Sequence, residues 1–134
     1  MREIKFRAWH KPTQLMDDVA LIDFYNDKIG TLYADPFVQG ESMKKYSFNE
    51  IVLMQSTGLK DKNGVEIFEG DIVENTTQRV YLGHRFEVSW NGGYACFQLL
   101  NGGKSSNVPL IQDFMSYEVV GNIYENQEFE EVEG

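Results

Sequence analysis

Few residues of this chain could carry out acid–base, nucleophilic or metal chemistry. Among its 134 residues there is one cysteine, Cys96, and there are two histidines, His10 and His84. Structural zinc sites need Cys and His ligands at short, fixed spacings, and these three residues have no such spacing. A Cys96–His84 pair is conceivable in space, but neither a nucleophile elbow nor a glycine-rich oxyanion loop accompanies it. We therefore predict no catalytic residues, no metal ligands and no cofactor.

Two motifs superficially match ligand-binding loops. Asp61, Asn63 and Gly64 suggest a calcium loop, but an EF-hand loop has its glycine in the sixth position, whereas Gly64 is fourth from Asp61. Residues 102–105, Gly-Gly-Lys-Ser, match the end of a P-loop, but the preceding glycine is missing at the required spacing and no helix clearly follows. A turn and a flexible hairpin loop are therefore the favoured interpretations.

Three carboxylates gather at one corner of the sequence, at Glu66, Glu69 and Asp71. Two carboxylates can in principle divide the roles of acid and base. However, Asp71 follows Gly70, and an Asp in a turn accepts hydrogen bonds from nearby backbone N–H groups. We therefore predict a structural role for this cluster.

The stretch 53–73 has the densest turn signals of the chain. Asp61-Lys62-Asn63-Gly64 predicts a type I′ hairpin turn or a related bulged loop, because Asn and Gly tolerate positive φ. Glu69-Gly70-Asp71 predicts a second tight corner. We expect both corners to set strand register and their tips to form a candidate recognition surface. The residues of this surface are Lys60, Asp61, Lys62, Asn63, Glu69 and Asp71.

A second candidate surface, for nucleic acid, lies near the N-terminus. It consists of four basic residues and one aromatic residue: Arg2, Lys5, Arg7, Lys11 and Trp9. Aromatic and basic residues on one strand face can bind single strands. However, Glu3 interrupts this patch, and the net charge of −9 opposes contact with phosphates. Nucleic-acid binding is therefore disfavoured.

Composition predicts a single domain that spans residues 1–134. Hydrophobic residues make up 42% of the chain and aromatic residues 13%, which is enough for a core without disulfides. The N-terminus lacks the apolar segment of a signal peptide, and no stretch approaches the roughly 18 apolar residues of a membrane span. Residues 125–134 form an acidic tail that we expect to be solvated. We expect a soluble, cytoplasmic protein without membrane contact.

The elements that must position these residues are mostly strands. Residues 3–9 alternate between apolar and polar side chains, which predicts a half-buried strand. Further strands are expected over residues 15–25, 29–33, 51–58, 65–68, 72–73, 80–82, 86–90, 94–99 and 117–124. Residues 34–46 and 101–107 predict loops, and residues 47–50 and 109–115 predict short helical turns. The sequence therefore predicts a mainly β fold, either a small twisted β-barrel or packed antiparallel sheets, with one or two short helical turns.

Five segments occur in a distinctive order along the chain. They are REIKFRAW at residues 2–9, LMQ and TGLKDKNG within residues 53–64, EGDIV at residues 69–73 and VGNIYEN at residues 120–126. Together they resemble the YopX family of small proteins from bacteriophages and prophages of Gram-positive bacteria. His10 departs from the acidic residue expected there, and Ser56 departs from an aromatic residue. The resemblance implies the cytoplasm of an infected or lysogenic host bacterium as the setting, and it supplies no catalytic residues to carry over.

These observations favour a noncatalytic accessory protein that binds another protein, of the phage or the host, or binds itself as a homo-oligomer. The basis is the set of aromatic-rich strands, whose edges invite pairing. One alternative is acidic mimicry of nucleic acid, in which carboxylates occupy the basic cleft of a host DNA-binding protein. Two others are weak nucleic-acid binding through the N-terminal patch, and an enzyme whose site is assembled from distant residues.

Overall fold

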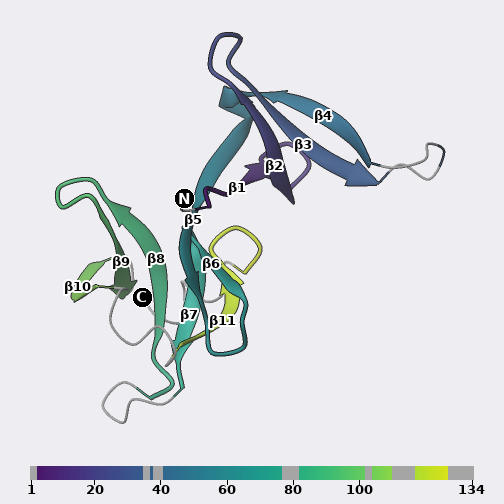
Figure 1. Ribbon diagram of the computed structural model, residues 1–134. Coiled ribbons are helices and arrows are strands. Elements are labelled where there is room, and N and C mark those ends of the chain that lie inside the picture. Colours follow the sequence, from purple (N-terminus) through teal and green to yellow (C-terminus); the bar gives the residue numbers. More distant parts are fainter. Residues whose placement is uncertain are drawn as a thin grey trace. The chain divides into compact units, whose positions relative to one another are not determined.

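The computed structural model describes residues 3–34, 37, 41–76, 82–101, 104–109 and 117–126 (Figure 1). The chain divides into two compact units, Ile4–Gln55 and Met1–Glu3 with Ser56–Gly134, called here the N-terminal unit and the C-terminal unit. The boundary falls inside strand β5 (Ile51–Lys60). The chain therefore passes from one unit to the other within a strand rather than through a linker.

The N-terminal unit is an antiparallel sheet. Its strands are β1 (Phe6–His10), β2 (Leu15–Asp23), β3 (Lys28–Ala34), β4 (Glu41–Ser47) and the first half of β5. Their hydrogen-bonded order is β4-β3-β2-β1-β5, so the strands predicted over residues 3–9, 15–25 and 29–33 form an antiparallel meander. The core is a buried cluster of Ala8, Ile29 and Ile51, with Val19, Ile22, Tyr46, Phe48 and Leu53 packed against it.

A short helical turn precedes β5, as the sequence predicts. This turn is the 3-10 helix η1 (Phe48–Glu50). Ser47, Phe48, Asn49 and Glu50 match a capping box in sequence, but this motif does not form, because the Ser47 side chain makes no cap hydrogen bond. Its hydroxyl instead accepts a hydrogen bond of 2.9 Å from Lys28 Nζ. Ser47 therefore ties the end of β4 to the start of β3.

The prediction of a loop over residues 34–46 is wrong for Ala34, which ends β3, and for residues 41–46, which belong to β4. The strand pairs with β3 in continuous register, from Lys28 opposite Ser47 to Ala34 opposite Glu41. It is the outermost strand of its sheet, and Lys44 and Lys45 on it are exposed. Edge strands commonly carry Lys, and these charges hide the alternation by which a strand is recognised in a sequence.

The C-terminal unit contains the second half of β5, the short strand β6 (Glu66–Phe68) and a five-stranded antiparallel sheet. The sheet comprises β7 (Asp71–Asn75), β8 (Arg85–Asn91), β9 (Cys96–Asn101), β10 (Lys104–Pro109) and β11 (Tyr117–Asn122), in the order β10-β9-β8-β7-β11. Its buried core cluster consists of Ile67, Val73, Phe86, Val88, Leu99 and Tyr117. The mainly β prediction is confirmed, as antiparallel sheets rather than a closed barrel in the part of the chain that the structure describes.

Several predicted elements differ in the C-terminal unit. Residues 104–107, expected in a loop, belong to β10, and Pro109 ends this strand rather than beginning a helix. Proline is tolerated there because β10 is an edge strand. Leu82 lies in a turn and not in a strand, whereas residues 80–81 and 110–115 of the expected elements lie outside the described residues.

Candidate functional site

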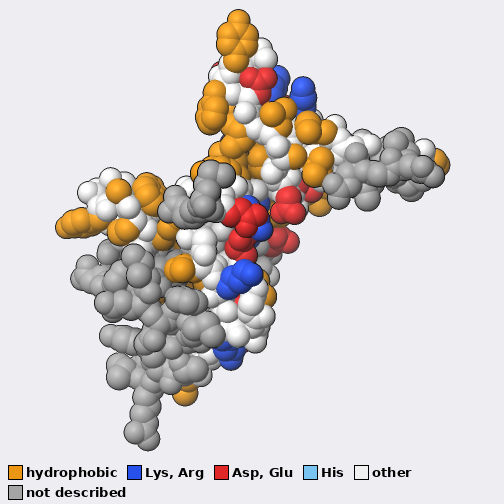
Figure 2. Space-filling view, viewed as in Figure 1, with side chains coloured by type: hydrophobic (Ala, Val, Ile, Leu, Met, Phe, Trp, Pro, Cys, Tyr) orange, Lys and Arg blue, Asp and Glu red, His pale blue; other side chains and the backbone are white. Residues whose placement is uncertain are grey.

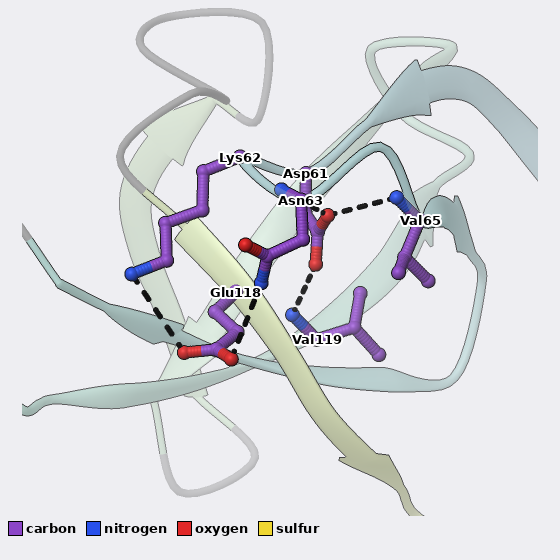
Figure 3. A network of polar contacts seen from close by, with 6 residues as sticks. All are labelled: Asp61, Lys62, Asn63, Val65, Glu118 and Val119. Atoms are coloured by element: carbon purple, nitrogen blue, oxygen red, sulfur yellow. Dashed lines mark hydrogen bonds and ion pairs between the residues drawn. The ribbon is translucent and has the colours of Figure 1, made fainter.

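The loop between β5 and β6 is organised by the side chain of Asp61 (Figure 3). Asp61 Oδ1 accepts hydrogen bonds from the backbone N–H groups of Asn63 at 2.8 Å and Val65 at 2.9 Å. Asp61 Oδ2 accepts a third, of 2.9 Å, from the N–H of Val119 on β11. The carboxylate therefore joins the β5–β6 loop to a strand more than fifty positions away in the sequence.

Of the two conformations predicted for this loop, the structure has the bulged loop and not the type I′ hairpin turn. Gly64 has φ of +82°, but Asn63 is not among the residues with positive φ, which a type I′ turn requires at both central positions. Asp61 N–H donates to the Val65 carbonyl at 2.8 Å, and Gly64 N–H donates to the Asp61 carbonyl at 3.0 Å. The sequence signal for this turn thus comes from Gly64 and the Asp61 side chain.

Burial removes Asp61 and Asp71 from the predicted recognition surface. Each is only 2% exposed. Asp71 Oδ2 accepts a hydrogen bond of 2.8 Å from the N–H of Phe68, which confirms the structural role expected for this carboxylate. Buried carboxylates that accept backbone N–H groups stabilise turns and offer no surface to a partner.

The exposed tip of the β5–β6 loop makes contacts within its own unit (Figure 3). Lys62 Nζ lies 3.8 Å from Glu118 Oε2, and Asn63 Nδ2 donates to Glu118 Oε1 at 3.3 Å. Such surface ion pairs contribute about 1 kcal/mol or less. Recognition by Lys60, Lys62, Asn63 and Glu69 remains a hypothesis.

The second predicted corner, Glu69-Gly70-Asp71, is held by backbone hydrogen bonds. Gly70 has φ of +89°. Its N–H donates to the Val88 carbonyl at 2.8 Å, and its carbonyl accepts from the N–H of Ile123 at 2.9 Å. Gly70 therefore links β8 to the residue that follows β11, as expected for a corner that sets register.

The N-terminal basic patch lacks an accessible stacking platform. Trp9, its only aromatic member, is 9% exposed, so its ring cannot receive a base. Lys5 and Lys11 are exposed and Arg7 is half-buried, whereas Arg2 lies outside the described residues. Trp9 therefore does not offer the stacking contact for a single strand that this patch was predicted to contain.

Sequence reasoning missed a polar cluster around His10, which directly follows the strand predicted over residues 3–9. His10 ends β1 and is 7% exposed. Its Nδ1 lies 2.6 Å from Thr13 Oγ1, and its Nε2 lies 3.5 Å from Glu50 Oε2. Its ring stacks on Tyr46, with the centroids 3.9 Å apart. Extending the alternation of Ile4, Phe6 and Ala8 by one more step would have placed His10 on the buried face.

A hydroxyl, an imidazole and a carboxylate in this order also occur in nucleophilic triads. Here, however, the hydroxyl belongs to the turn that directly follows His10. Gln14 N–H donates to the His10 carbonyl at 2.8 Å, and Lys11 N–H donates to the Glu50 carbonyl at 2.9 Å. We interpret the cluster as a clamp that holds the β1–β2 turn against η1.

The other residues considered for nucleophilic catalysis are too far apart. Those considered for phosphate binding lie in the wrong type of element. Cys96 pairs with Asn91 at one end of β8, and His84 precedes the other end. Seven strand residues at about 3.3 Å each separate them by roughly 20 Å, which rules out a Cys–His nucleophile pair. Lys104 and Ser105 begin a strand and not the helix that a P-loop requires.

Among the described residues, no three His, Cys, Asp or Glu side chains gather closely enough to hold a metal ion. The same part of the chain contains no helix that is long and apolar enough to cross a membrane.

The structure is that of a mainly β protein with two Gly-containing corners. The polar clusters around Asp61 and His10 hold its turns in place. The model of the YopX protein family matches residues 5–129, and the chain belongs to this family. A crystal structure of protein EF1440 from Enterococcus faecalis is similar, with 30% sequence identity, a TM-score of 0.63, and coverage of 96% of this chain and 98% of that one. No curated protein matches the chain.

Proposed function

We propose that this protein is a noncatalytic phage or prophage accessory protein that binds another protein in the cytoplasm of its bacterial host. The observation that carries the proposal is the concentration of exposed apolar side chains on the N-terminal unit. Of the twelve large hydrophobic residues that are exposed in the described part of the chain, eight belong to this unit. They are Ile4, Leu15, Leu21, Phe24, Tyr25, Leu32, Phe37 and Met43. Exposed apolar patches of this kind mark interaction sites.

Three of these residues form a continuous patch on one face of the sheet. Leu32 lies opposite Met43 in the β3–β4 register, and Leu21 lies opposite Gly30 in the β2–β3 register. A Cβ atom at Gly30 would lie 2.7 Å from Met43 Sδ and 3.1 Å from Leu21 Cβ, so both side chains close over the glycine. Figure 2 shows apolar side chains gathered over this unit. We call Leu21, Leu32 and Met43 the apolar patch.

The charge distribution supports a protein partner for this unit. Residues 4–55 contain six of the 12 basic residues of the chain and seven of its 21 acidic residues. This part of the chain is therefore almost neutral, although the whole chain carries a net charge of −9. A nearly neutral, partly apolar surface fits a protein better than a nucleic acid, whose phosphates require an excess of Lys and Arg.

The test compares affinity capture from host lysate by the wild-type protein and two variants. Leu32→Asp places a charge in the apolar patch, and Val65→Asp places the same charge at an exposed apolar position in the C-terminal unit. We expect quantitative mass spectrometry to find a protein that the wild type and Val65→Asp capture and that Leu32→Asp loses. Equal capture by all three, with circular dichroism unchanged, would contradict the role of the patch. Light scattering on the wild type separates a foreign partner from a second copy.

A further inference from the structure

The outer edge of β4 has the features of a site for strand addition. Among the described residues, β4 is hydrogen-bonded to β3 and to no other strand, because it ends the order of its sheet. An edge strand presents backbone N–H and C=O groups to which an extended peptide can pair. Its seven residues, Glu41–Ser47, are long enough for such pairing.

We propose that β4 binds an extended acidic segment of a partner protein as an added strand, an inference that rests on the protein-binding function proposed above. The charge of the edge selects this partner. Lys44 and Lys45 are consecutive and exposed in the middle of β4. Because strand side chains alternate, these lysines project from opposite faces of the sheet, Lys44 on the face of Thr31 and Lys45 on the face of Gly30. An added strand would therefore meet a cation on each face.

Met43, which precedes Lys44 on β4, determines which type of residue the partner segment needs at the next position. Met43 belongs to the apolar patch and shares its face with Lys45 and Leu32. Directly opposed pairs stabilise a sheet when their charges are opposite or when both side chains are apolar. The complementary segment thus has two adjacent acidic residues opposite Lys44 and Lys45, and an apolar residue opposite Met43.

The charges of Lys44 and Lys45 disfavour two other partners for the edge of β4. These are a second copy of β4 and a neutral apolar strand. If two copies of β4 paired antiparallel along all seven residues, Lys44 would lie opposite Lys44 of the second copy, and like charges in that position destabilise pairing. Lysines on an edge also discourage pairing with neutral apolar strands. Lys45 already influences Asp23, but it is the smallest of the causes that lower the pKa of that carboxyl.

The experiment measures binding of short synthetic peptides to the full chain by fluorescence anisotropy at low salt. The probe is a labelled peptide of alternating Thr and Val residues that contains one central Glu-Glu-Val. We expect it to bind, a Lys-Lys-Val peptide not to bind, and a version with Pro inside the central segment to lose binding, because Pro removes a backbone donor. Amide exchange of β4 should slow when the first peptide is bound.

Two double variants assign the site. Lys44→Glu/Lys45→Glu should weaken binding of the Glu-Glu-Val peptide by roughly tenfold or more, because each attraction becomes a repulsion, and it should create binding to the Lys-Lys-Val peptide. The control Lys5→Glu/Lys11→Glu makes the same change of charge at exposed positions of the same unit. It should leave the affinity within about twofold, because neither lysine lies on β4, where an added strand would pair.

Each contrary outcome has a defined meaning. Equal weakening by both double variants, or binding of the Pro peptide, would indicate nonspecific electrostatic attraction instead of strand addition. Either result would overturn the inference. Self-association of the wild type that Lys44→Glu/Lys45→Glu alters would assign the edge to a second copy and also overturn it. If no acidic peptide binds while Leu32→Asp still abolishes capture of a lysate protein, the strand-addition inference fails and the proposed function stands. If the peptide binds but Leu32→Asp captures the same proteins as the wild type, the apolar patch is not a binding site. That part of the proposed function is then wrong.

Discussion

At the level of a single residue, the side chain of Asp61 connects the β5–β6 loop to β11. Its carboxylate is 2% exposed and accepts three backbone N–H groups, two within the β5–β6 loop and one on β11. A hydrogen bond to a charged acceptor contributes about 1.5–3 kcal/mol, and removal of the acceptor also leaves buried donors unpaired. The position therefore matters for stability and not for surface recognition.

Replacement of Asp61 should accordingly destabilise the protein. We expect Asp61→Ala to lower the free energy of unfolding by about 3 kcal/mol or more, as measured by urea denaturation. Asp61→Asn should lower it less, since one side-chain oxygen remains to accept the loop N–H groups. The exposed Asp18 on β2 provides the control, and Asp18→Ala should change stability by no more than about 0.5 kcal/mol. Similar losses for Asp61→Ala and Asp18→Ala would contradict the assigned role of Asp61.

Asp23 should make the stability of its turn dependent on pH in the acid range. The side-chain amide of Asn26 lowers the pKa of Asp23 below its ordinary value of 3.8, assisted by the backbone N–H groups of Asn26 and Tyr25. Because the pKa is lower in the folded state, the stabilisation is present above 3.8 and is lost as pH falls through the folded-state value.

The carboxyl of Asp23 should therefore titrate below 3.8 in a carbon-detected NMR titration of the folded protein. The difference in stability between the wild type and Asp23→Asn should shrink as pH falls below that value. Titration of Asp23 at or above 3.8 would show that the Asn26 contact does not form in solution.

At the level of elements, sequence patterns succeeded where a turn or an alternation was strong. Gly64 and Gly70 marked both corners, and the regular alternation around Val88 and Leu99 marked β8 and β9. Strands β4 and β10 were missed because they are sheet edges, where polar and charged side chains replace the apolar alternation. The His10 clamp was missed because Tyr46 and Glu50 are far from His10 in the sequence and come close to it only in the folded sheet.

The β5–β6 loop should depend on the backbone conformation of Gly64 more than on the space around it. Gly64 has φ of +82°, and no atom lies within 4 Å of the position that a Cβ would take, so a new methyl group meets strain and not a clash. Gly64→Ala should cost about 1 kcal/mol, and Gly64→Asn less, because Asn tolerates the left-handed region. Gly92 has equal space without positive φ, so Gly92→Ala is the matched control and should be nearly neutral in thermal unfolding. A cost for Gly92→Ala as large as that for Gly64→Ala would contradict the strain argument.

At the level of the whole molecule, one chain builds two separate cores without a linker. Ala8, Ile29 and Ile51 form the buried cluster of the N-terminal unit, whereas Val88 and Leu99 belong to that of the C-terminal unit. The sequence did not reveal this division, because β5 continues through the boundary as an unbroken strand and carries no Pro or Ser-rich break. Membership in the YopX family spans both units, since the family model matches residues 5–129.

Two cores predict two unfolding transitions that can be moved separately. The two tryptophans report on them, because Trp9 lies in the N-terminal unit and Trp90 in the C-terminal unit. With 5-fluorotryptophan at both positions, fluorine NMR during urea denaturation follows each unit in the intact chain. Ile29→Ala should destabilise the Trp9 transition by about 3 kcal/mol, and Leu99→Ala should do the same to the Trp90 transition, because both side chains are fully buried.

In each of these variants the other transition should shift by less than about 1 kcal/mol, since substitutions in different cores share no packing partners. Trp9 and Trp90 would then lose their native signals at different urea concentrations, which a two-state protein does not show. Coincident transitions that move together in both variants would instead mean that the strand β5 couples the units so strongly that the chain unfolds as one cooperative structure.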